Sequence, residues 1–163
     1  LKDFCESLPD YPGIKVTELT SMPAIVVRDS VSMEDMPAFM GTYLPQLYMY
    51  AMRMEANMAG HPYSTYFHWN PDGKTYMEVG LPLETAIEGE DVIIPGKTPE
   101  GKAVKGIYYG DYNDMIVVYE AIEKYMTVMK YEPQGLAWEV YITSPTQEPD
   151  TSKWETHVYF PIK

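Results

Sequence analysis

The same order of predicted elements occurs twice along this chain of 163 residues. Residues 64–71 align with residues 138–145 at an offset of 74, and both segments lead from a strand to a proline. Residues 76–83 align with residues 155–162 at an offset of 79, and both keep a valine, an apolar residue and a proline near the strand end. Each half therefore predicts strand, helix, strand and strand, a unit that buries one helix against its own strands.

Two apolar stripes with alternating steps of three and four residues predict the main helices. The first stripe runs from Met36 to Met58, and Pro45 inside it is expected to kink or divide the helix. The second stripe runs from Met115 to Met129. Apolar residues between turn signals predict strands over residues 14–29 with a break at 21–23, and over 63–69, 76–83, 103–109, 138–143 and 156–162. The predicted fold class is α+β, with an antiparallel sheet and two main helices.

The predicted organisation is a single domain over residues 14–163 that follows an N-terminal extension, residues 1–13. Its two pseudo-repeats cover residues 14–83 and 103–163. Connector 84–102 joins them; it is acidic, rich in Gly and Pro, and has room for a short strand. Two such units packed side by side leave a groove at their pseudo-twofold axis. Because both halves contribute side chains to a groove of this kind, we expect a ligand cleft there.

The charge and the aromatic content narrow the choice of partner. Twelve Lys and Arg against 24 Asp and Glu give a formal net charge of −12, which argues against direct nucleic-acid contact and against a polybasic membrane anchor. The chain also holds 15 Tyr and 12 Met. Tyr and Met are adaptable contact residues, so they suggest a planar, apolar or cationic ligand. Core filling by the same residues is the alternative interpretation.

The sequence shows no metal or cofactor motif. Cys5 is the only cysteine, so it cannot form an internal disulfide, and we expect a reducing, cytoplasmic compartment. His61, His68 and His157 do not have the spacing of metal ligands, and no glycine-rich phosphate loop or serine nucleophile elbow occurs. No apolar run approaches the roughly 18 residues of a membrane span. We therefore predict no metal, no cofactor and no membrane partner, and the oligomeric state stays open.

Four short segments carry a resemblance to a known family. They are the runs GLAWEVYITSP (residues 135–145), WETHVYFPI (residues 154–162), MEVGLPL (residues 77–83) and YYGDY (residues 108–112). Together these segments resemble the GyrI-like small-molecule-binding domain, also called the AraC-type effector-binding domain, over nearly the whole chain after Gly13. One position departs from the family pattern, because His157 stands where the family usually shows Glu.

The resemblance implies a duplicated strand-helix-strand-strand fold, of the type called SHS2, with a central cleft for hydrophobic and often cationic drug-like molecules. Family members fused to a DNA-binding module control transcription by this binding, and others act alone as sequestering or protective proteins. The resemblance also implies that Glu139 lies at the base of the cleft and faces the ligand. Some stand-alone members are linked to hydrolysis of strained cyclopropane-bearing cytotoxins, using pocket acids and aromatics.

The residues themselves make Glu139 a candidate site. Glu139 interrupts an apolar strand, and an ionised carboxylate there needs a partner, solvent access or a raised pKa. It can neutralise a cationic ligand, or it can act as an acid or base in catalysis. His157 is either an acid-base partner or an ordinary strand histidine. The predicted walls of the site are the aromatic residues Tyr108, Tyr112, Tyr141, Tyr159, Phe67 and Trp69.

Three functions are compatible with these residues. The first is a ligand-binding module that sequesters bulky hydrophobic, planar or cationic compounds, or that senses them for a transcriptional regulator. The second is a hydrolase of strained small molecules that uses Glu139 as its acid-base residue, so the sequence leaves open whether the protein is an enzyme. The third is a module that inhibits an enzyme such as a topoisomerase, in which the negative charge mimics nucleic acid.

Overall fold

The computed structural model describes residues 14–143 and 148–163. The predicted extension with Cys5 and part of the last predicted loop therefore lie outside the described residues. The chain divides into two compact units. Unit 1 combines the N-terminal residues up to Leu19 with residues 101–163, and unit 2 covers residues 20–100.

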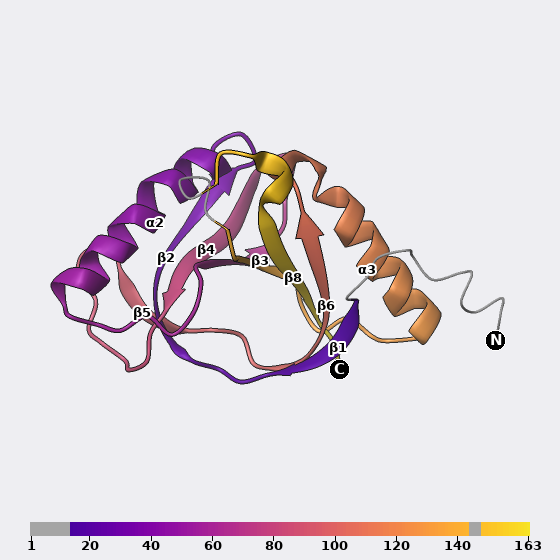
Figure 1. Ribbon diagram of the computed structural model, residues 1–163, viewed down its shortest axis with the longest axis horizontal. Helices are drawn as coiled ribbons and strands as arrows, with labels where there is room; N and C mark the ends of the chain where they lie inside the picture. The colour runs from indigo at the N-terminus through magenta and orange to yellow at the C-terminus, as the bar shows by residue number, and fades with distance from the viewer. Residues whose placement is uncertain (1–13, 144–147) are drawn as a thin grey trace. The chain divides into compact units, whose positions relative to one another are not determined.

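Unit 2 is a four-stranded antiparallel sheet with one helix. Along the chain its elements are β2 (Pro23–Ser32), α2 (Met36–Arg53), β3 (Tyr63–His68), β4 (Lys74–Pro82) and β5 (Ile94–Lys97). The strands lie in the order β3-β4-β2-β5, and every neighbouring pair is antiparallel. Helix α2 runs along one face of these strands (Figure 1).

Unit 1 likewise has four strands and one α-helix, together with two short 3-10 helices. They are β1 (Lys15–Leu19), β6 (Gly101–Tyr109), the short 3-10 helix η1 (Tyr112–Asp114), α3 (Ile116–Met129), β7 (Trp138–Tyr141), a second 3-10 helix η2 (Thr151–Lys153) and β8 (Glu155–Pro161). The strands lie in the antiparallel order β1-β6-β8-β7, with α3 against them (Figure 1). The predicted α+β class, with antiparallel strands and two main helices, is confirmed.

Each unit has its own core between its helix and its strands. In unit 2 the buried side chains of β2 and β4 that meet α2 include Val27, Val79 and Leu81, and α2 contributes Leu47. In unit 1 Val104 and Val158 meet Val118 and Ile122 of α3. Since strand residues alternate between faces, these cores identify the covered face of each sheet.

The two units differ from the predicted pseudo-repeats at the first and last of their strands. Strand β1 pairs with β6 and belongs to unit 1, because Ile14 and Val16 pack against the unit 1 core. Strand β5 comes from the predicted connector and pairs with β2 in unit 2. The chain passes from unit 1 to unit 2 between Leu19 and Thr20, just before the predicted break at residues 21–23. Hence β1 has the place beside β6 that β5 has beside β2.

Helix α2 is shorter than its apolar stripe predicts. It ends at Arg53, before the last two residues of the stripe, and Met54 and Met58 are exposed. Glu55 adopts a left-handed backbone conformation, with φ of 55°, which stops the helix there. Pro45 lies inside α2 and does not divide it.

Candidate ligand-binding site

The centre of the candidate site is Glu139 in β7, which is 6% exposed. Both of its carboxylate oxygens accept hydrogen bonds from tyrosine hydroxyls. Tyr141 donates to Oε1 at 2.9 Å, and Tyr119 of α3 donates to Oε2. Burying a carboxylate is costly unless it is hydrogen-bonded, and donated hydroxyl hydrogens stabilise its charged form. The two tyrosines therefore make a buried carboxylate tolerable at this position.

Strand register explains why Glu139 points toward α3. In the β7–β8 pair, Glu139 lies opposite Val158 and Tyr141 lies opposite Thr156. Directly opposed residues share one face of a sheet. Val158 is fully buried in the unit 1 core, on the α3 face. The carboxylate therefore lies between strand and helix, where Tyr119 reaches it.

A chain of aromatic rings extends from this carboxylate. The ring of Tyr112 lies 5.8 Å from that of Tyr141 in an edge-to-face arrangement, and 5.1 Å from that of Trp154. Burial raises the pKa of Tyr112, and the nearby negative charge of Glu139 raises it further. Tyr112 therefore lies next to Tyr141, the residue whose hydroxyl donates to Glu139, and its predicted role in ligand binding stays a prediction.

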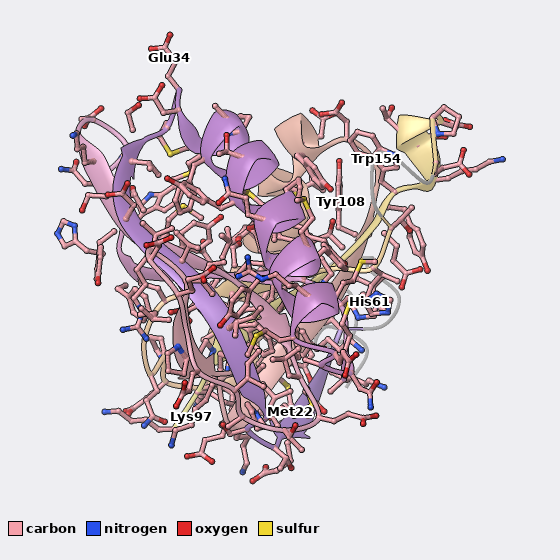
Figure 2. All side chains as sticks on the ribbon, turned by 90° about the vertical axis from the view of Figure 1, so that its left-hand side faces the viewer. Met22, Glu34, His61, Lys97, Tyr108 and Trp154 are labelled. Carbon is pink, nitrogen blue, oxygen red and sulfur yellow. The ribbon has the colours of Figure 1, made fainter. Side chains whose placement is uncertain are left out.

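Tyr108 holds the corner that carries Tyr112. Its side chain is buried, and its hydroxyl donates to the carbonyl oxygen of Asp111 at 2.6 Å. Gly110 has φ of 140°, and a side chain there would meet the Tyr108 hydroxyl at 2.8 Å. The N–H of Gly110 donates to the carbonyl oxygen of Trp154 at 2.8 Å, and Figure 2 shows Tyr108 and Trp154 in the upper part of the view. Tyr108 thus supports the site through the backbone.

His157 and Tyr159 do not share a sheet face with Glu139, and their predicted role in ligand binding stays a prediction. In β8 these residues lie opposite Val140 and Trp138, on the sheet face away from α3. Tyr159 stacks on Trp138 with 4.6 Å between ring centroids. The His157 Nε2 atom lies 2.5 Å from Glu155 Oε2. Residues that are odd-numbered in β7 and in β8 fall on opposite faces because of the pairing register, which sequence spacing does not reveal.

Phe67 and Trp69 belong to unit 2, and each is 45% exposed. Phe67 lies 5.3 Å from the ring of Tyr76, and Trp69 lies 5.3 Å from the ring of Tyr66. Their predicted role as walls around Glu139 stays a prediction.

The strand register also corrects the repeat alignment. Tyr63 opposes Gly80 in unit 2, and Trp138 opposes Tyr159 in unit 1. With the last strands aligned at an offset of 79, the preceding strands align at 75 instead of 74. The counterpart of Tyr141 is therefore Tyr66, not Phe67. The counterpart of Glu139 is Ser64, which is fully buried.

Sequence reasoning missed two residues of this site, Tyr119 and Trp154. Tyr119 belongs to the apolar stripe of α3, so the pattern assigns it to the core. Trp154 lies in one of the family-like segments, but only the structure brings it to Tyr112. Neither contact follows from spacing, because both depend on how α3 and the loop before β8 lie against the strands.

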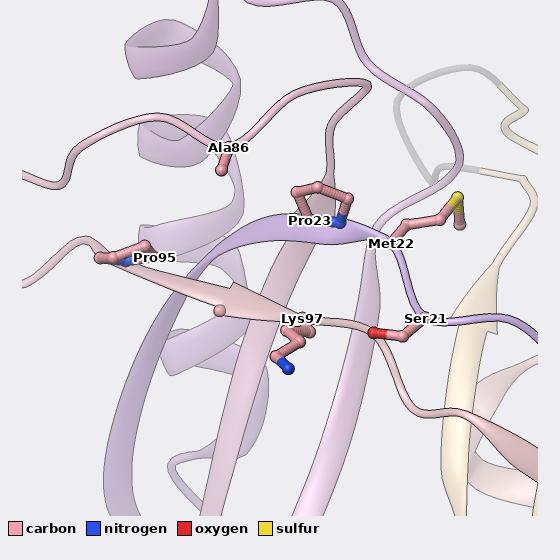
Figure 3. A pocket seen from close by; sticks show the side chains of 7 residues that line it. Ser21, Met22, Pro23, Ala86, Pro95 and Lys97 are labelled. Carbon is pink, nitrogen blue, oxygen red and sulfur yellow. The ribbon is translucent and has the colours of Figure 1, made fainter.

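A separate depression of about 410 Å³ lies in unit 2 (Figure 3). It is lined by residues around the start of β2, the β5 strand and the loop between β4 and β5: Ser21, Met22, Pro23, Ala86, Pro95, Gly96 and Lys97. Met22 and Lys97 lie together at the lower end of the view in Figure 2. The lining is mostly apolar and includes no predicted site residue.

Among residues 14–143 and 148–163, no group of three or more His, Cys, Asp or Glu side chains is placed to hold a metal ion. In the same residues, no helix combines the length and the apolar character needed to cross a membrane.

A comparison with known protein families shows to which family the chain belongs. Residues 13–163 match the GyrI-like small molecule binding domain. The chain belongs to this family. The predicted resemblance is thereby confirmed over almost the entire GyrI-like chain, and the description of the family supports a small molecule as its partner. No curated protein matches the sequence.

Solved structures share the GyrI-like fold at low sequence identity. The C-terminal domain of EcmrR is 18% identical with a TM-score of 0.80, and the match covers 92% of this chain and 96% of that domain. A hydrolase from Listeria innocua is 11% identical with a TM-score of 0.66, covering 99% and 98%. SAV2435 bound to tetraphenylphosphonium is 14% identical with a TM-score of 0.55, covering 92% and 93%. At these low identities, the TM-scores show a shared fold and nothing beyond it.

One of these relatives is longer than the GyrI-like chain. The EcmrR chain of an EcmrR–DNA complex matches with a TM-score of 0.81 and 18% identity. The match covers 92% of this chain but 57% of the EcmrR chain. The present sequence therefore spans little more than half of that protein.

Proposed function

We propose that the protein binds bulky hydrophobic cations and planar apolar molecules, with Glu139 as the charge partner of the ligand. The observation that supports this proposal best is the buried Glu139 carboxylate, held by the hydroxyls of Tyr119 and Tyr141 and followed by the rings of Tyr112 and Trp154. A carboxylate surrounded by aromatic rings attracts a cation in two ways. The carboxylate contributes its negative charge, and the rings contribute their π surfaces. Each cation–π contact contributes about 0.5 to 2 kcal/mol.

The site also suggests which cations are favoured. A large cation with spread charge loses little hydration when it leaves water, and it gains dispersion contacts with the tyrosine rings. Tetraphenylphosphonium is such an ion, and the similar fold of SAV2435 was solved with it bound. The phosphonium ion is therefore the appropriate first probe for this chain.

The biological role in this proposal is sensing or sequestration in the cytoplasm. EcmrR, whose C-terminal domain shares the fold, was solved in a complex with DNA. A net charge of −12 makes the present residues unsuited to DNA contact, so a regulator built on them would bind DNA through another module. A protein without such a module would lower the free concentration of a toxic cation.

Isothermal titration calorimetry with tetraphenylphosphonium tests the proposal. We expect saturable binding to the wild type and a loss of affinity of at least about tenfold in Glu139→Gln, because the amide keeps the size but not the charge. Glu120→Gln is the matched control, since Glu120 follows Tyr119 on α3 and is exposed. Equal affinity of the wild type and Glu139→Gln would show that Glu139 is not the charge partner.

The second candidate function is hydrolysis of strained cyclopropane-bearing compounds. It is supported by the Listeria innocua structures of the same fold that are named hydrolases. It is also supported by the two hydroxyls that donate to Glu139, because they favour the ionised carboxylate, the form that accepts a proton from water as a general base. Ring opening would add the hydroxyl and the proton of one water across the breaking C–C bond.

Mass spectrometry separates this second function from binding alone. A hydrolase converts a cyclopropane-bearing test compound into a product heavier by one water, and Glu139→Gln should stop the conversion. A binding protein leaves the compound intact and holds it in stoichiometric amount. Turnover that persists in Glu139→Gln would remove the carboxylate from the mechanism.

A further inference from the structure

A second polar site lies in unit 2, on the sheet face away from α2. Arg28 of β2 lies opposite Glu78 of β4, and its Nε donates to Glu78 Oε2 at 2.7 Å. The Glu78 side chain is 4% exposed, whereas that of Arg28 is 40% exposed. Their neighbours Val27 and Val79 face α2, so strand alternation directs Arg28 and Glu78 to the other side.

One aromatic ring lies against this guanidinium, and a second ring lies beside the first. The Arg28 guanidinium lies over the ring of Phe67, 5.3 Å from its centroid. The ring of Phe67 is tilted by 40° against that of Tyr76, with 5.3 Å between centroids. Phe67 is 45% exposed and Tyr76 is 41% exposed. Two adjacent exposed rings beside a charged group form a patch that offers both apolar contact and charge.

Glu78 fixes the orientation of the guanidinium and occupies only its Nε side. Among residues 14–143 and 148–163, no acceptor contacts the two Nη nitrogens of Arg28. These nitrogens form the end of the planar fork, whose geometry matches a carboxylate with two parallel hydrogen bonds. Because Arg28 is already held by Glu78 and Phe67, binding such a group costs little further side-chain entropy.

We propose that Arg28, Phe67 and Tyr76 form a binding site for an aromatic carboxylate. The carboxylate accepts hydrogen bonds from the two Nη nitrogens, and the aromatic ring of the ligand packs against Phe67 and Tyr76. Glu78 acts as the positioning residue for Arg28. This site differs from that of Glu139 in its unit and in the sign of the charge that it binds. It does not depend on the function proposed for Glu139.

NMR titration of the whole chain with benzoate tests this site. We expect the side-chain resonances of Arg28, Phe67 and Tyr76 to shift together along one saturating curve. Benzyl alcohol should bind at least about tenfold more weakly, because a neutral hydroxyl cannot replace a carboxylate on the fork. Shifts that rise linearly without saturation, or equal binding of benzyl alcohol, would overturn the proposal.

Two variants test whether benzoate is recognised by the planar fork of Arg28 or merely attracted by its positive charge. Arg28→Lys keeps the charge and loses the fork, so its benzoate affinity should fall at least about fivefold. Arg53→Lys is the matched control, because Arg53 also pairs with a glutamate, Glu90, and lies over the ring of Tyr50. Its affinity should equal that of the wild type. If Arg28→Lys unfolds, Phe67→Leu serves in its place with the same expected loss.

The Glu139→Gln variant distinguishes the two sites. Benzoate binding should be unchanged in that variant, whatever becomes of phosphonium binding. Equal benzoate affinity of the wild type, Arg28→Lys and Phe67→Leu would overturn the proposal.

Discussion

Tyr119 of α3 donates its hydroxyl hydrogen to the carboxylate of Glu139 in β7. This bond joins the helix of unit 1 to a strand that α3 otherwise contacts little, and it ends on a buried charge. A hydrogen bond to a charged group contributes about 1.5 to 3 kcal/mol. We therefore expect Tyr119→Phe to lower the free energy of unfolding by about that amount, as measured by urea denaturation.

Tyr125→Phe is the control for this prediction. Tyr125 lies on the same helix and stacks on Tyr131 at 6.2 Å, and within the described part of the chain its hydroxyl makes no hydrogen bond. Its substitution should leave the unfolding free energy within about 0.5 kcal/mol of the wild type. If Tyr125→Phe lowers the free energy of unfolding as much as Tyr119→Phe does, the hydrogen bond from Tyr119 to Glu139 does not account for the loss.

Gly106 of β6 is expected to tolerate no side chain. A methyl group there would meet Ile122 Cδ1 of α3 at 2.8 Å and Val118 Cγ2 at 3.0 Å. Gly106→Ala should destabilise the protein by about 1 to 3 kcal/mol, because the side chains of Ile122 and Val118 must shift within a packed core. Thermal unfolding followed by circular dichroism measures this effect.

Gly41, in the helix of unit 2, is a glycine at which a methyl group has room. Among the described residues, nothing lies within 4 Å of a methyl group placed on Gly41, which is in the interior of α2. Gly41→Ala should therefore stabilise the protein by up to about 1 kcal/mol, since alanine is the better helix former. A Gly106→Ala variant as stable as Gly41→Ala would contradict the close approach of α3 to β6.

The buried Glu78 predicts a pH dependence of stability. Burial raises its pKa in the folded state above the ordinary value of 4.5, although Arg28 opposes the shift. Between 4.5 and the folded pKa, the folded state binds more protons than the unfolded state, so this group's contribution to stability falls as the pH rises.

Urea denaturation of the wild type and Glu78→Gln across this range measures that contribution. The free energy of unfolding of the wild type, relative to that of Glu78→Gln, should decrease as the pH increases from 4.5. A relative stability that is constant or that increases with pH would mean that the Glu78 pKa is not raised.

Trp154 should report on ligand binding near Glu139. Its indole N–H donates to the carbonyl oxygen of Glu148 at 2.7 Å, and its ring contacts Tyr112. A cation bound among these rings should change the emission of Trp154, so Trp154→Phe should remove most of the fluorescence response to tetraphenylphosphonium. A response of full size in Trp154→Phe would place the ligand near another tryptophan.

Most of the fold could be predicted from local patterns. The β3, β4, β6 and β8 strands and the α3 helix lie within one or two residues of the predicted ranges, because alternation and helical spacing are local properties. The assignment of β1 to unit 1 could not be predicted. It depends on pairing with β6 across more than 80 residues, and an isolated strand pattern does not identify its partner.

The candidate site was predictable only in part. Glu139 and Tyr141 share a face because they are two residues apart in one strand, and the structure joins them by a hydrogen bond. The sheet face on which His157 lies could not be predicted, because it depends on which residue of β7 lies opposite it. One residue of register reverses every face, and side-chain spacing within β8 carries no information about that choice.

The counterpart of Glu139 in the other unit is Ser64, which is likewise a buried polar residue. The two units thus share a pattern of strand pairing and differ in chemistry at this position, which is anionic in unit 1 and neutral in unit 2. A single polypeptide therefore carries two chemically distinct versions of one strand position. Exchange of the two residues, by Ser64→Glu together with Glu139→Ser, would ask whether the charge or its location in the sequence defines the function.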